Sequence, residues 1–158
     1  MPVVWKPNVT VAAVVERAGR FLLVEEDTAD GLRLNQPAGH LDPGETPLDG
    51  AIREALEETA RVFTPSALLG IYMARTLPAT ERQPVTYLRF AFVGTVGEAE
   101  PGRTLDHGIL RTLWLTADEI RARRPEHRSP LVMKCIDDYL AGQRYPLSLV
   151  YAHPSVVE

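Results

Sequence analysis

Three glutamates, Glu54, Glu57 and Glu58, stand at positions i, i+3 and i+4 of one segment. In a helix this spacing places the three carboxylates on one stripe, which we expect to lie opposite the apolar face. Like charges at this spacing repel each other by about 0.2–0.5 kcal/mol per pair in water. A hard divalent cation such as Mg²⁺ or Mn²⁺ would reverse that sign, because it binds clustered carboxylate oxygens. The alternative for an acidic triplet taken alone is a solvated helix face.

The residues before and between these glutamates predict the helix that such a stripe requires. Thr46 can cap its N-terminus, and Pro47 takes the first helical position, where its missing N–H is harmless. The negative charge of Asp49 suits the positive end of the helix dipole. Apolar positions then recur at helical spacing and should face a core; they are Leu48, Ile52, Ala55, Leu56 and the methyl group of Thr59.

The stretch from Gly39 to Ala60 reads GHLDPGETPLDGAIREALEETA. Its fixed positions are Gly39, Glu45 after five intervening residues, Arg53-Glu54 after seven more, and Glu57-Glu58 after two more. This pattern resembles the sequence box of the Nudix hydrolases. Two positions depart from that box, with Ala60 where glycine is usual and Arg61 where a bulky apolar residue is expected. Both departures fall at the helix C-terminus, so they concern how the chain turns away rather than the carboxylates.

The resemblance extends beyond the box, from about Lys6 to Leu147, and narrows to the NudJ-type group of Nudix phosphatases. The stretches that carry it are KPNVTVAAVVE, NQPAGHL, LRF, RSPLV and GQRYPL. Members of that group are nonspecific nucleoside tri- and diphosphatases that also hydrolyse hydroxymethylpyrimidine pyrophosphate. The resemblance therefore implies a small phosphatase that depends on Mg²⁺, with Mn²⁺ as a substitute, and that has relaxed base selectivity.

The resemblance also implies roles for individual box residues. Glu57 and Glu58 match the principal metal ligands of the family. Glu54, one turn back, could bind a second ion or deprotonate the attacking water, and the sequence leaves both roles open. Arg53 stands at i−4 from Glu57 and can brace that carboxylate with its guanidinium group. Gly39 would offer its backbone carbonyl to a metal ion, since a side chain there would crowd the approach.

Candidates also lie in the loops around the helix. Glu45 would hold its loop to the helix or assist a metal ligand. Nudix enzymes often recruit a further acid from outside the box, and we predict Asp106, which lies in the loop just before the strand that contains Trp114. Glu98 and Glu100 compete for this role.

Four residues are candidate substrate contacts, and each could equally be a packing or surface residue: Trp5, Gln36, Tyr87 and Arg89. Tyr87 and Arg89 share one face of a predicted strand over residues 85–96, whose other face carries Leu88, Phe90 and Phe92. This polar and aromatic face either lines a cleft or is a solvated sheet face.

Composition limits the function classes. A chain of 158 residues with 45% hydrophobic and 24% charged residues predicts one soluble domain, spanning residues 1–158, with a substantial core. A net charge of −4 gives no global attraction for nucleic acid or an anionic membrane. The chain shows no membrane-spanning run and no signal-peptide pattern. The single cysteine, Cys135, lies in an apolar-periodic segment, so we expect a core residue and a reducing, cytoplasmic setting.

The order of predicted elements favours an α/β fold with a mixed sheet between helical layers, as in the Nudix fold. Residues 27–33, 78–84 and 98–107 are predicted loops. A capping box over Thr116–Glu119 opens a short helix, and Ser129-Pro130 begins a last helix that ends near Ala141. The predicted strands cover residues 8–16 and 20–26, which we expect to pair as a hairpin, together with residues 67–76, 85–96 and 109–115.

The leading functional hypothesis is metal-dependent hydrolysis of nucleoside di- or triphosphates, or of hydroxymethylpyrimidine pyrophosphate, with release of phosphate. A second is a Nudix pyrophosphohydrolase for oxidised nucleotides or ADP-ribose. A third is a non-catalytic nucleotide-sensing module, which would be expected to have lost box carboxylates. The predicted partner is a small-molecule substrate, with the protein as a monomer or small homo-oligomer.

Overall fold

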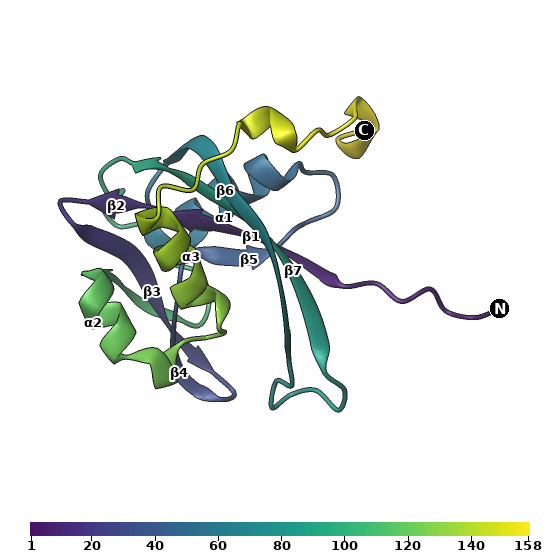
Figure 1. Cartoon of the computed structure of the whole chain (residues 1–158), viewed down its shortest axis with the longest axis horizontal. Helices are drawn as coiled ribbons and strands as arrows, with labels where there is room; N and C mark the ends of the chain where they lie inside the picture. The colour runs from purple at the N-terminus through teal and green to yellow at the C-terminus, as the bar shows by residue number, and fades with distance from the viewer.

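The computed structural model describes residues 1–158 and places β1 (Asn8–Val14) inside a mixed four-stranded sheet. On one side β1 pairs antiparallel with β5 (Ala38–His40). On the other side β1 pairs parallel with β7 (Val85–Val96), which pairs antiparallel with β6 (Phe63–Thr76). The strand order is therefore β5-β1-β7-β6 (Figure 1).

A second sheet is built around β3 (Arg20–Thr28). This strand pairs antiparallel with β2 (Glu16–Arg17), with β4 (Gly31–Asn35) and with β8 (Ile109–Leu115). The apolar run from Phe21 to Val24 is buried, so β3 carries the sheet through the interior and brings its polar C-terminal half toward the molecular surface.

Three α-helices complete the fold: α1 (Pro47–Thr59), α2 (Ala117–Ala122) and α3 (Leu131–Leu140). Thr46 caps α1 as predicted, because its hydroxyl accepts a hydrogen bond from the Asp49 N–H. Short 3₁₀ turns lie at Arg124–Glu126, Leu147–Leu149 and Pro154–Val156. None of the helices combines the length and the apolar character needed to cross a bilayer.

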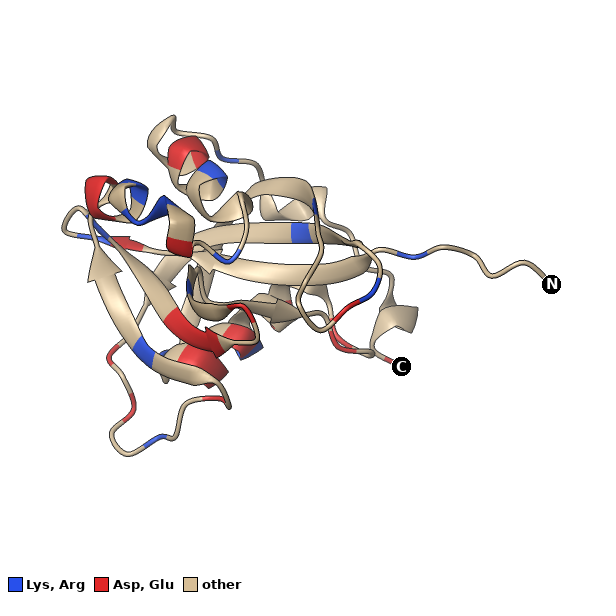
Figure 2. Ribbon diagram, turned by 90° about the horizontal axis from the view of Figure 1, so that it is seen from below, with Lys and Arg blue, Asp and Glu red and all other residues tan.

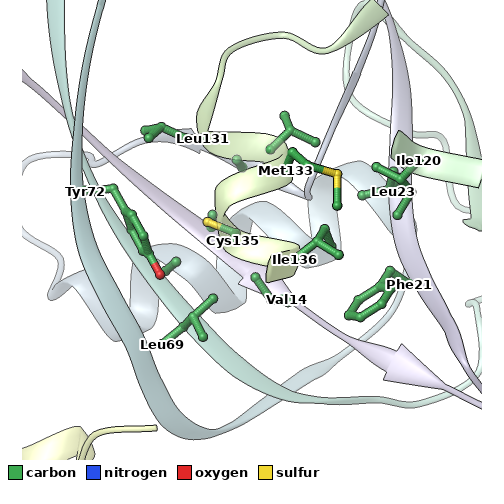
Figure 3. Close-up of a cluster of buried hydrophobic side chains, with 14 of the residues drawn as sticks. Val14, Phe21, Leu23, Leu69, Tyr72, Ile120, Leu131, Met133, Cys135 and Ile136 are labelled. Carbon is green, nitrogen blue, oxygen red and sulfur yellow. The ribbon is translucent and has the colours of Figure 1, made fainter. Parts of the chain in front are cut away.

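Alternate residues of β1 point to opposite faces of its sheet, and each face packs against a different helix. Val11 and Ala13 belong to the core cluster that includes Ala51 and Ala55 of α1. Ala12 and Val14 belong to the other cluster, whose helical members come mainly from α3, as Figure 3 shows. The predicted mixed sheet between helical layers is therefore confirmed, and the predicted burial of Cys135 is confirmed as well.

Several predicted boundaries were wrong. Residues 27–33, predicted as a loop, form the ends of β3 and β4 and the turn between them. The expected hairpin of residues 8–16 with 20–26 is limited to β2 and β3, because β1 pairs with β5 and β7 instead. Strand β6 begins at Phe63 rather than near residue 67. The errors at β1 and β6 concern pairing with strands distant in sequence, which local residue patterns do not encode. The error at residues 27–33 is different, because β3 and β4 form a local hairpin whose polar residues were taken for a loop.

The end of α1 explains the two departures from the family box. Ala60 adopts φ 60° and ψ 23°, the left-handed conformation that glycine usually supplies at a helix C-terminus. Arg61 lies 5.6 Å from the centroid of the Trp114 ring and donates a hydrogen bond to the Gly97 carbonyl at 2.8 Å. The methylenes and cation of Arg61 therefore take the place of an apolar side chain at this position.

The turn between β2 and β3 generates a stability prediction. Ala18 and Gly19 connect the paired residues Arg17 and Arg20, and both have positive φ, as in a type I′ turn. Alanine is disfavoured in this region, whereas asparagine tolerates it. We expect Ala18→Asn to raise the free energy of unfolding by about 0.5–1 kcal/mol in urea denaturation. Gly19→Ala should instead lower the free energy of unfolding. If Ala18→Asn leaves the free energy of unfolding unchanged, the turn assignment is contradicted.

Candidate active site

Arg53 of α1 joins the loop before the helix to two glutamates on the helix. Its Nε and Nη2 atoms donate to the two carboxylate oxygens of Glu45 at 2.9 and 2.8 Å. Its Nη1 donates to Glu54 at 2.8 Å and to Glu57 at 3.1 Å, and Nη2 also donates to the His40 carbonyl at 3.0 Å. The hydrogen bond from Arg53 lowers the pKa of Glu45. Arg53 therefore fixes the positions of three carboxylates at once.

The glutamate stripe does not lie opposite the core, as the helical spacing suggested. Only 7% of Glu54 and 6% of Glu58 is exposed, because both side chains face β5, which covers this side of α1. Glu58 accepts a hydrogen bond from the Ala38 N–H at 2.9 Å. A Cβ atom at Gly39 would overlap the Glu54 carboxylate, so the absence of a side chain at position 39 permits this close packing. Glu57 stays partly exposed beside them.

Burial shifts the acidity of the two covered glutamates. It raises the pKa of Glu58 to about 9, and the like charges of Glu26, Glu54 and Asp106 act in the same direction against the hydrogen bond from Ala38. Burial also raises the pKa of Glu54, with the guanidinium of Arg53 acting in the opposite direction. Both shifts favour the protonated, uncharged form of these carboxyl groups.

Asp106 reaches this site through the backbone. Its N–H donates to the Glu57 carbonyl at 2.9 Å, which fastens the loop before β8 to the last turns of α1. Its charge raises the pKa of both buried glutamates. Glu100 instead pairs with Arg103 at 3.0 Å, and Glu98 is exposed. Of the three candidate acids, Asp106 is the one that acts electrostatically on the buried glutamates.

Glu26 belongs to the same acidic group and was missed from the sequence. It lies on β3, lines the same cavity as Glu58, and forms a 3.3 Å ion pair with Arg128. Burial raises the pKa of Glu26. In the sequence, Glu26 directly follows the buried run that ends at Glu25, and this position was the available signal for an acid near the core. Its acidic neighbours become visible only once β3 is packed beside α1. In Figure 2 the acidic ribbon of β3 lies next to that of α1.

These residues suit a hard divalent cation by their chemistry. They offer carboxylate oxygens of like charge on rigid elements, next to a glycine that leaves room for the Glu54 carboxylate. In the present arrangement no three acidic or histidine side chains form a ready-made ligand set, because Arg53 and the Ala38 N–H hold the glutamates toward separate partners. Residues that could hold a cation are Gly39, Glu54, Glu57, Glu58 and Asp106, with Glu26 added by the structure.

A cavity of about 450 Å³ opens beside the acidic group. Gly39 and Glu58 line it, and so do Tyr87 and Arg89 of β7. The polar face of β7 therefore lines a cleft rather than a solvated sheet face. Gln36, only 1% exposed, lies behind the wall and bonds to Arg89. Trp5 is 67% exposed on the N-terminal segment that extends from the body (Figure 1), and it does not line the cavity.

Comparison with known proteins agrees with this geometry. The family model described as the NUDIX domain matches residues 5–135. The chain belongs to the Nudix hydrolase family. It is 40% identical to the protein named Phosphatase NudJ of Escherichia coli K12 over 147 residues, which cover 92% of each chain. A Nudix hydrolase structure from Nitrosomonas europaea shares 51% identity at a TM-score of 0.87, covering 94% of this chain and 98% of the other. As a Nudix hydrolase, the protein is an enzyme that acts on phosphoanhydrides.

More distant Nudix structures share the fold alone. An ADP-ribose pyrophosphatase from Streptococcus suis aligns with a TM-score of 0.63 at 12% identity, over 89% of this chain and 96% of the other. The structure of a UDP-X diphosphatase aligns with a TM-score of 0.69 at 16% identity, over 91% of this chain and 68% of the other. The Nudix fold that the box predicted is thus confirmed.

The raised pKa of Glu58 generates a prediction on stability. Between pH 4.5 and about 9 the folded state holds a proton that an unfolded glutamate has lost. The free energy of unfolding should therefore fall as the pH rises through this range. Glu58→Gln keeps an oxygen for the Ala38 N–H and removes the titration. In urea denaturation with EDTA, we expect the decrease between pH 5 and 9 to be smaller in Glu58→Gln by about 1 kcal/mol or more.

The control for this experiment is Glu81→Gln, which changes an exposed glutamate outside the acidic group. Its pH dependence should follow that of the unmodified protein. Equal pH dependence in Glu58→Gln and Glu81→Gln would show that Glu58 does not titrate between pH 5 and 9.

Proposed function

We propose that this Nudix hydrolase cleaves phosphoanhydride bonds of nucleoside tri- and diphosphates, and of hydroxymethylpyrimidine pyrophosphate, with release of phosphate and with Mg²⁺ or Mn²⁺ as cofactor. The observation that carries the proposal is the group of buried glutamates beside a cavity of small-molecule size. Two findings support it: divalent-metal use is general in the family, and the curated relatives are named phosphatases.

The acidic residues explain why a cation is needed. Phosphate oxygens are anionic and would be repelled by Glu54, Glu57 and Glu58. A bound divalent ion would neutralise both sides and lower the pKa of an attacking water. Glu57 and Glu58 would hold the ion, with the Gly39 backbone and Asp106 as further ligands.

The remaining box residues position this group. Arg53 orients Glu54 and Glu57 and, through Glu45, ties the preceding loop to the helix. Glu54 can act as a ligand or as the group that takes the proton from water. Burial makes its carboxylate a stronger proton acceptor.

Product analysis separates this function from a pyrophosphohydrolase acting on oxidised nucleotides or ADP-ribose. Orthophosphate supports the proposed function. Pyrophosphate, or a nucleoside monophosphate with a sugar phosphate, would support the alternative. A non-catalytic sensing module is disfavoured because all the box carboxylates are present.

Glu57→Gln tests the metal-site assignment. Glu57 is partly exposed, so the fold should survive, while phosphate release with Mg²⁺ should fall about a hundredfold or more because a charged ligand is lost. Glu81→Gln is the matched control and should keep normal turnover. Near-normal turnover of Glu57→Gln would overturn the assignment.

Asp106→Asn tests the acid from outside the box. We expect the apparent affinity for Mn²⁺, measured from the metal dependence of turnover, to weaken about tenfold. Glu98→Gln and Glu100→Gln remove acids that lie earlier in the same loop and should leave this affinity unchanged. If either of these variants loses more Mn²⁺ affinity than Asp106→Asn does, that residue rather than Asp106 is the metal ligand from outside the box.

A further inference from the structure

Arg89 is an arginine that is buried without a carboxylate partner. Only 5% of it is exposed, and no acidic oxygen lies within 4.0 Å of its guanidinium. Its Nη1 donates to Gln36 Oε1 at 2.9 Å and weakly to Cys135 Sγ at 3.8 Å, and its Nη2 donates to Asn35 Oδ1 at 2.9 Å. Its direct hydrogen-bond partners are all neutral, and the carboxylate that feels its charge is Glu26, whose pKa Arg89 lowers without contacting it.

The hydrogen bonds leave part of the guanidinium free. Of its five N–H groups, those on Nε and one on Nη2 have no protein acceptor. Arg89 and Asn35 line the cavity. Gln36 is fixed from behind, because its Nε2 donates to the Val132 carbonyl at 2.9 Å. The guanidinium of this cavity-lining residue is therefore held in place, and donors on two adjacent nitrogens, Nε and Nη2, have no protein acceptor.

The surroundings of these donors suit a flat, neutral ring. Tyr87 follows the same face of β7, and its ring lies 6.2 Å from the His40 ring, centroid to centroid. Ala74 and Leu131 add apolar wall. Glu26 also lines the cavity, and its carboxylate disfavours a phosphate placed here unless a cation lies between them. Gly39 and Glu58, beside which a cation would take the phosphates, line the same cavity.

We propose that Arg89, positioned by Asn35 and Gln36, is a specificity residue that donates hydrogen bonds to the acceptor edge of a nucleotide base. This inference rests on the proposed function and assigns the part of the substrate that the cavity reads. Two adjacent donors match two adjacent acceptors, such as O2 and N3 of cytosine or O6 and N7 of guanine. In adenine the N6 amino group, a donor, lies next to both the N1 and the N7 acceptors. Adenine therefore offers no pair of adjacent acceptors on these edges and fits less well.

The test compares substrates with and without a base. In Arg89→Met, kcat/KM for CTP and GTP should fall about tenfold or more, while kcat/KM for methyl triphosphate, which has no base, should stay within about twofold. Arg89→Lys keeps the charge but not the paired donors, and should show the same selective loss with a normal melting temperature. Arg33→Met removes another arginine that lines the cavity and is the matched control, with no selective loss expected.

A second measurement uses a ligand without phosphate. Cytidine should bind the unmodified protein in calorimetric titration and should bind Arg89→Lys at least tenfold more weakly. Equal losses for CTP and methyl triphosphate would indicate a phosphate contact and overturn the proposal, as would unchanged kinetics in both variants or no binding of cytidine. Absence of turnover in the unmodified protein would instead contradict the proposed function, and the cytidine titration would still decide the role of Arg89.

Discussion

The site depends on the packing of carboxylates against a strand where ordinary folding would place apolar side chains. Glu54 and Glu58 are buried between α1 and β5. Their carboxyl groups accept hydrogen bonds from Arg53 and from the Ala38 N–H, respectively. Burial disfavours the charged form of both carboxyl groups and raises their pKa values. The rest of the structure tolerates this cost because the two core clusters on either side of the sheet are apolar and continuous. The unfavourable burial of carboxyl groups is thereby confined to the edge of the sheet formed by β5.

That edge is placed by the topology of the sheet. Strand β5 is short and pairs only with β1, so its backbone is free on the other side, where the glutamates of α1 approach. The loop before β8 is tied to the Glu57 carbonyl by Asp106 and to the Ala60 carbonyl by Glu100. Strand β3 supplies Glu26 from the second sheet. Three segments distant in sequence thus converge on the last turns of one helix.

The parts of the fold and site that could be predicted from the sequence are those set by interactions between residues close together in the chain. The Thr46 cap and the start of α1 were predictable, because a cap is a local hydrogen bond between residues three apart. The box positions were predictable because their spacing is specific. Glu26 was not, because its neighbours are set by how the two sheets pack. The burial of the glutamates was also not predictable, since helical periodicity gives the direction of a side chain but not what covers it.

Because alternate residues of β1 belong to different core clusters, α1 and α3 pack on opposite faces of one sheet and share few core neighbours. The residues around Arg89, including Cys135 of α3, lie on one layer, and the box helix lies on the other. Substitutions that repack α3 can therefore remodel the far wall of the cleft without disturbing α1. A protein built in this way can diversify what it accepts over evolutionary time while the machinery that breaks bonds is inherited unchanged.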